Sequence, residues 1–131
     1  MFKLSNKTAI VTGASKGIGK EIAINLAQHG SNLILISRSL DSLKKTEKLI
    51  NTTYNVNVEC ISLDISNFDN TKKTFSKIIS NNRIDILVNN AGITRDNIIL
   101  RMSEENWDDV INTNLKGCFN CCKFIIKHMI K

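Results

Sequence analysis

Apolar residues fall along this chain in short runs that alternate with segments of helical periodicity. The strand-like runs span residues 8–11, 32–37, 56–63 and 84–89, and the helix-like segments span residues 17–28, 40–50, 69–80 and 103–131. The runs are rich in Ile, Leu and Val with little polar alternation, as in strands covered on both faces by helices. Right-handed crossovers then give an α/β fold, a doubly wound parallel sheet of the Rossmann type. The sequence predicts four β-α units and the start of a fifth helical region.

The last helical segment opens with Ser103-Glu104-Glu105, a capping residue followed by an acidic first turn. Its apolar stripe comprises Trp107, Val110, Ile111 and Leu115. The printed sequence contains no further strand, so we expect one incomplete domain over residues 1–131. The fourth strand and the last helix would then be partly uncovered, which favours aggregation or capture of a partner.

Length and composition exclude several classes of protein. A chain of 131 residues with 42% hydrophobic and 23% charged residues is long enough for one ordinary globular domain. Its longest apolar runs fall far short of the ~20 residues that a transmembrane helix needs. Residues 1–7 contain no apolar signal-peptide core. We expect no membrane association and a cytoplasmic location.

The net charge of +6 comes from 18 basic and 12 acidic residues. The lysines are scattered at helix-like positions without interleaved aromatic residues, which is typical of a solvated helix face. Nucleic acid is therefore not the expected partner.

The cysteines show no pattern typical of a metal site. There is no second C-x-x-C pair, and neither histidine stands at a zinc-ligand spacing from the cysteines. We predict no metal and interpret the three cysteines of the last helix as buried packing residues in a reducing compartment. These are Cys118, Cys121 and Cys122.

A glycine-rich turn joins the first strand to the first helix. Glycines allow a sharp turn and close approach of the backbone to a pyrophosphate, and the N–H groups at a helix N-terminus favour an anion. The alternative is a tight turn that binds nothing. The candidate phosphate-binding residues are Gly13, Ala14, Ser15, Lys16, Gly17, Ile18 and Gly19.

The spacing of this turn is G-x-x-x-G-x-G after a threonine, and Asn89-Asn90-Ala91-Gly92 follows the fourth strand. Together the two motifs resemble the short-chain dehydrogenase/reductase family, and the resemblance covers the whole chain. It implies that Asp64 and Ile65 lie against the adenine and that Asn90, Ala91 and Gly92 contact the cofactor. Asn90 has a second interpretation, in which it only ties the fourth strand to its neighbours, and both roles can hold at once.

The end of the second strand bears on the choice of cofactor. In doubly wound folds an acidic residue there selects NAD, whereas a basic one accommodates a 2′-phosphate. This chain has Ser37-Arg38-Ser39 at that point, and a guanidinium can bind a phosphate through two hydrogen bonds. The sequence predicts NADP(H), with Lys16 as a second cation. The alternative is that both are ordinary surface cations.

Residues 90–97, with Leu100-Arg101-Met102 and Trp107, resemble one branch of the family, the 3-oxoacyl-(acyl-carrier-protein) reductases. This similarity implies NADPH-dependent reduction of a 3-oxoacyl thioester to the 3-hydroxyacyl form in fatty acid synthesis. It also implies a substrate held on acyl carrier protein and full-length homotetramers. A positive net charge suits an acidic carrier protein.

The resemblance also implies a catalytic serine and a Tyr-x-x-x-Lys pair, none of which this chain provides. Its one tyrosine, Tyr54, is followed four residues later by Val58. Asn114, within Asn112-Thr113-Asn114-Leu115, matches the asparagine that holds a water of the proton relay. Alternatively, its amide bonds nearby backbone and kinks the helix.

We therefore expect the chain alone to be inactive, since general acid catalysis contributes ~10²–10⁴-fold. Three other interpretations stay open. The chain could be a non-catalytic NADP-binding or interaction module, or its catalytic half could be a separate chain. It could also belong to a short-chain dehydrogenase/reductase that acts on another carbonyl or alcohol.

Overall fold

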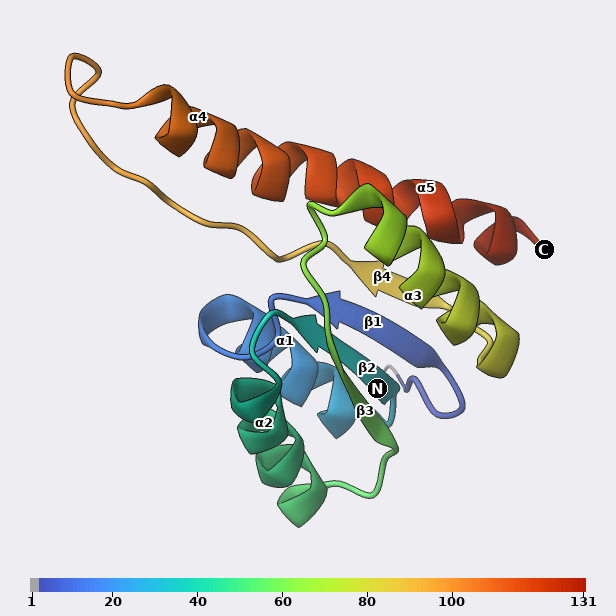
Figure 1. Cartoon of the computed structure of the whole chain (residues 1–131). Helices are drawn as coiled ribbons and strands as arrows, with labels where there is room; N and C mark the ends of the chain where they lie inside the picture. Colours follow the sequence, from blue (N-terminus) through green and yellow to red (C-terminus); the bar gives the residue numbers. More distant parts are fainter. Residues whose placement is uncertain (1–2) are drawn as a thin grey trace.

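The computed structural model describes residues 3–131. Its core is a four-stranded parallel sheet in the order β3-β2-β1-β4 (Figure 1). The strands are β1 (Thr8–Thr12), β2 (Asn32–Ser37), β3 (Val58–Ser62) and β4 (Ile86–Val88). The helices are α1 (Gly17–Gln28), α2 (Leu40–Thr53), α3 (Phe68–Asn81), α4 (Glu104–Val110), the π-helix η1 (Ile111–Lys116) and α5 (Gly117–Ile130). The predicted doubly wound α/β fold is confirmed.

Alternating strand residues fill two separate cores. On β1, Ile10 points to one face of the sheet while Ala9 and Val11 point to the other, as the two-residue period of a strand requires. The first core is closed by α3 and α5, through residues such as Phe75 and Ile125. The second core is closed by α1 and α2 (Figure 1). This division of the helices leaves the carboxyl ends of the strands open at one edge.

Two predicted strands are longer than the observed ones. The strand predicted over 84–89 covers only Ile86–Val88, and the one predicted over 56–63 covers only Val58–Ser62. Ile84 is buried in the first core, but its N–H donates to Nε2 of His128 on α5, at 3.0 Å, rather than to a neighbouring strand. Buried residues therefore extend beyond the residues that pair in the sheet. An apolar run predicts which residues are buried, but not where the strand pairing begins and ends.

The predicted cap of the last helical region is confirmed, because the Ser103 hydroxyl accepts a hydrogen bond from the Asn106 N–H at 3.0 Å. The predicted helical region over 103–131 is confirmed, and residues 111–116 within it form a π-helix, η1. Trp107 and Leu115 of the predicted stripe are exposed by 59% and 65%. This exposure agrees with the expectation that the last helical region is partly uncovered.

Within residues 3–131, β4 pairs with β1 alone, and its three residues are half-buried. The expected sheet edge is thus present in the described part of the chain. Among those residues, no helix is both long enough and apolar enough to cross a bilayer.

Candidate functional site

A cavity of about 760 Å³ lies at the carboxyl ends of the strands, where the glycine-rich turn meets the loops after β2, β3 and β4. It collects most of the candidate residues from four separate parts of the sequence. Ala14 and Gly19 are buried behind the turn, and Asn114 does not line the cavity although its neighbour Thr113 does. The predicted residues that line it are Gly13, Ser15, Lys16, Gly17, Ile18, Arg38, Asp64, Ile65, Asn90, Ala91 and Gly92.

The glycine-rich turn depends on the absence of side chains at defined positions. Gly13 and Gly17 have φ values of +66° and +58°, a region that L side chains rarely adopt. A Cβ on Gly19 would overlap the Gly13 carbonyl oxygen and the Asn90 side-chain nitrogen. The turn is also anchored to its surroundings, since the Gly13 N–H donates to the Ile36 carbonyl at 2.8 Å. These contacts hold the backbone close to the cavity wall.

Helix α1 begins at this turn without a side-chain cap. Lys16 stands at its N-cap position and forms no capping hydrogen bond, and the first turn contains no acidic residue. By contrast, α2, α3 and α4 are capped by Ser39, Asn67 and Ser103. The N–H groups at the start of α1 are therefore available to an anion, with the positive end of the helix dipole behind them.

Thr12 fastens the glycine-rich turn to the Asn90-Ala91-Gly92 loop. Its buried hydroxyl accepts hydrogen bonds from the N–H groups of Asn90 and Ala91, both at 3.0 Å, and donates to the Val88 carbonyl at 3.3 Å. The Asn90 amide donates in turn to the Gly13 carbonyl at 3.2 Å. Asn90 thus ties two strand ends together and also lines the cavity. Sequence reasoning noted the threonine but missed this role, which depends on partners more than 70 residues away.

Arg38 follows β2 at the rim of the cavity, beside Ser37, Ser39 and Ser42. No carboxylate stands at this strand end. The Arg38 side chain is exposed and forms no ion pair with any described residue. Its carbonyl accepts a hydrogen bond from the Ser62 hydroxyl at 2.9 Å, which fixes its backbone to the end of β3. The Arg38 backbone is therefore fixed beside the cavity, and its guanidinium donates to none of the described residues.

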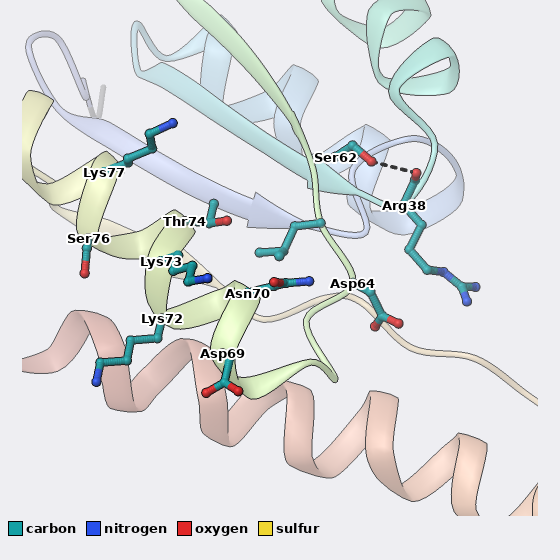
Figure 2. Close-up of a pocket in the computed structure, with 11 residues that line it drawn as sticks. Arg38, Ser62, Asp64, Asp69, Asn70, Lys72, Lys73, Thr74, Ser76 and Lys77 are labelled. Atoms are coloured by element: carbon teal, nitrogen blue, oxygen red, sulfur yellow. Dashed lines mark hydrogen bonds between the residues drawn. The ribbon is translucent and has the colours of Figure 1, made fainter.

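A second hollow, of about 1150 Å³, lies between β3 and α3 and shares Arg38, Leu63 and Asp64 with the first. Figure 2 shows Arg38 and Asp64 directed to one side, away from the lysines of α3. The hollow is wide and lined mainly by exposed side chains of α3. Of these two hollows, only the first is lined by the glycine-rich turn, and it is therefore the candidate site.

Asn114 is fully engaged with the loop that follows β4. Its Oδ1 accepts from the Ile93 N–H at 2.8 Å, and its Nδ2 donates to the Ile93 carbonyl at 3.0 Å. It lies inside the π-helix, a rare conformation that is frequent at functional sites. The side chain thus holds the loop that forms one wall of the cavity. The role in a proton relay stays a prediction.

Tyr54 lies at the end of α2, half-buried against the second core, and does not line the cavity. It offers no proton donor at this site. Burial raises the pKa of the Cys60 and Cys121 thiols to about 12, so these two are poor nucleophiles. Cys121 is buried as predicted. Cys118 is half-buried, and the prediction of burial is wrong for Cys122, which is exposed.

The thiol pKa values predict a labelling pattern. With iodoacetamide at pH 8, Cys60 and Cys121 should react about 1000-fold more slowly than a thiol of pKa 9, because their thiolate fraction is smaller by that factor. Their rates should rise as the pH approaches 12. Mass spectrometry of the native chain, with the urea-unfolded chain as control, measures both rates. Equal labelling of all four cysteines in the native chain would contradict this assignment.

Comparison with known proteins places these features in a family. The model of the short chain dehydrogenase family matches residues 7–131. The 3-oxoacyl-(acyl-carrier-protein) reductase FabG of Staphylococcus epidermidis is 42% identical over 129 residues, which are 96% of this chain and 52% of that protein. The FabG of Thermotoga maritima is also 42% identical, over 99% of this chain and 53% of its own length. The chain thus spans about half the length of the curated relatives it matches.

Solved structures agree. A metagenomic short-chain oxidoreductase in complex with NADP superimposes with a TM-score of 0.92 at 32% identity, over 97% of this chain and 58% of that one. L-sorbose reductase from Gluconobacter frateurii, complexed with NADPH and L-sorbose, gives a TM-score of 0.91 at 26% identity, over 98% of this chain and 49% of that one. From its glycine-rich turn to its Asn-Ala-Gly loop, this chain belongs to the short-chain dehydrogenase/reductase family.

Proposed function

We propose that the cavity binds NADP(H) and that the chain is the cofactor-binding part of a reductase acting on 3-oxoacyl thioesters carried by acyl carrier protein. The observation that carries the cofactor proposal is the position of Arg38. It follows β2, has no ion-pair partner among the described residues, and lines the same cavity as the glycine-rich turn. The 42% identity to FabG proteins supports the substrate class.

The residues present fit a dinucleotide. The uncapped start of α1 and the glycines that line the cavity beside it, Gly13 and Gly17, suit a pyrophosphate. Arg38 and Lys16 suit a 2′-phosphate at the adenosine end, and Asp64 lies at the same end of the cavity. When bound, the nicotinamide supplies a hydride to the substrate carbonyl.

The residues of this chain would bind the cofactor and orient it for that reaction. Asn90 and Asn114 hold the loop after β4 in place. Asn90 bonds to the Gly13 carbonyl, and Asn114 bonds to the backbone of Ile93. The side chain that would protonate the carbonyl oxygen does not come from Tyr54, which lies away from the cavity. We therefore propose that the chain alone binds cofactor without turning over a 3-oxoacyl thioester.

The cofactor proposal predicts that reversing the charge at position 38 abolishes the preference for NADPH over NADH. Arg38→Asp should weaken NADPH binding about 10- to 100-fold, because it removes charge-assisted hydrogen bonds and places a carboxylate beside the phosphate. NADH binding should change little. Titration of the purified chain with each nucleotide, followed by fluorescence, measures both affinities.

Arg101→Asp is the matched control, since Arg101 is an exposed arginine outside the cavity lining. It should leave both affinities unchanged. An unaltered ratio of NADPH to NADH affinity in Arg38→Asp would show that this guanidinium does not hold a phosphate. No binding of either nucleotide to the unmodified chain would overturn the cofactor proposal itself.

A further inference from the structure

Helix α5 contains a buried amide with one end unused. Asn120 is fully buried, and its Nδ2 donates to the Ile65 carbonyl at 2.8 Å across 55 positions of sequence. Its Oδ1 is the one buried side-chain polar atom among the described residues that has no hydrogen-bond partner. A buried acceptor without a partner lowers stability. An apolar side chain of similar shape would avoid that loss at Oδ1 but would take the donor from the Ile65 carbonyl. Packing alone therefore does not explain an asparagine here.

Ile65, whose carbonyl accepts the hydrogen bond from Asn120, makes a second contact with α5. Gly117 lies one turn earlier on α5, and a Cβ there would stand 2.7 Å from Cγ1 and Cδ1 of Ile65. The Ile65 side chain thus occupies space that any larger residue at 117 would take. Ile65 is held by its carbonyl and by its side chain, both from one face of α5.

Thr71 does not replace Asn120 as the donor. Its hydroxyl lies 3.3 Å from the Ile65 carbonyl but 2.7 Å from the Asn67 carbonyl, and a hydroxyl has a single proton to donate. The shorter contact is the stronger hydrogen bond, so the Thr71 hydroxyl donates mainly to the Asn67 carbonyl, four residues earlier at the start of α3. The amide of Asn120 is therefore the principal side-chain donor to Ile65.

Ile65 belongs to the turn that forms the adenine end of the candidate cavity. Asp64 and Ile65 both line that cavity. The Asp64 carboxylate is held within the turn by the Ser66 N–H at 3.0 Å and the Ser66 hydroxyl at 2.7 Å. The turn is thus internally ordered. Its start is tied to the end of β2, because the Leu63 N–H donates to the Ser37 carbonyl at 2.9 Å, and Ile65 ties its other side to α5.

The loop after β4 forms the opposite wall of the cavity. It is held by η1, which continues directly into α5. Asn114 in η1 pairs with the backbone of Ile93, while Asn120 in α5 bonds the backbone of Ile65. Two asparagines six positions apart therefore set the distance between the loop after β4 and the turn after β3. The binding of an extended nucleotide between these two walls would depend on their spacing.

We infer that Asn120 is a positioning residue, which acts through the Ile65 carbonyl to set the Asp64–Ile65 turn against the adenine end of the cofactor. This inference rests on the proposed function. It accounts for a polar side chain kept in the core although its Oδ1 has no partner, because the amide supplies the placement of the turn.

The test uses Asn120→Leu, which removes both the donor and the unpartnered acceptor. We expect a melting temperature close to that of the unmodified chain, because removal of the unpartnered Oδ1 offsets the loss of the donor to the Ile65 carbonyl. Affinity for NADPH and for 2′,5′-ADP, which carries the adenosine end alone, should fall about 5- to 10-fold. Gly117→Ala, which displaces the Ile65 side chain, should lower both affinities in the same direction.

Ile125→Val is the matched control, because Ile125 is a buried residue of the same helix that lies outside the cavity lining. It should lower the melting temperature and leave both affinities unchanged. Failure of Asn120→Leu to fold would overturn the inference, since the amide would then be structural. So would a folded Asn120→Leu variant with unaltered affinities. If the unmodified chain binds neither ligand, the proposed function fails as well, a result distinct from the other two.

Discussion

Gly19→Ala is expected to disrupt both the fold of the glycine-rich turn and nucleotide binding. The new Cβ would overlap the Gly13 carbonyl oxygen and the Asn90 side-chain nitrogen, and it would lie 2.8 Å from the Gly13 carbonyl carbon. Two of these atoms are backbone, so the turn must move to relieve the overlap. Overpacking of this kind costs about 3 kcal/mol, and displacement of the turn should weaken NADPH binding by roughly 100-fold. Urea denaturation and NADPH titration measure the two effects.

Gly30→Ala provides the control for a glycine replaced outside the cavity. Gly30 ends α1 with φ +93°, so alanine there is strained by about 1–2 kcal/mol. Its Cβ would meet only the Ser5 hydroxyl at 3.0 Å and the Ser5 backbone beyond that. Stability should fall while NADPH affinity stays close to that of the unmodified chain. Equal affinities for Gly19→Ala and Gly30→Ala would show that the close approach at Gly19 is not required.

Thr12→Val should have the second largest effect. Valine preserves the shape of the buried side chain but leaves the Ala91 N–H without its acceptor and the Asn90 N–H with only the Val88 carbonyl, at 3.1 Å. An unsatisfied group of this kind costs about 1–3 kcal/mol, so the free energy of unfolding should fall by about 2 kcal/mol. The Asn90-Ala91-Gly92 loop would lose its anchor, and NADPH binding should weaken about 10-fold.

Two variants separate the hydroxyl from the packing. Thr12→Ser keeps the acceptor and should retain most of the stability and affinity. Thr8→Val changes the same residue type at the start of β1, where the hydroxyl is bonded to none of the described residues, and should alter stability by less than about 0.5 kcal/mol. If Thr12→Ser is as damaging as Thr12→Val, the hydrogen bonds described here are not the source of the effect.

The layered fold could be predicted from the sequence because its information is local. A buried parallel strand is an uninterrupted apolar run, and a covering helix repeats every 3.6 residues. The glycine-rich turn could likewise be predicted, since glycines placed between a first strand and a first helix have a conformational reason to be there. Arg38 was found by its position after β2, which the order of elements defines.

The remaining parts of the site depend on partners distant in sequence. Thr12 acts on a loop 78 and 79 positions away, and Asn120 acts on Ile65, 55 positions away. Neither residue carries a local signal for its partner. The π-helix has no compositional signature either, because one added residue per turn changes hydrogen bonding and not polarity.

The uncapped start of α1 has a thermodynamic consequence. A helix that begins without a capping side chain keeps unsatisfied N–H groups, and here they face the cavity in which an anion is proposed to bind. A bound pyrophosphate would then complete the helix as its capping group. Folding and binding would be linked, with the folded state favoured by RT ln(1 + [ligand]/Kd). The resistance of the chain to unfolding would therefore follow the supply of its cofactor.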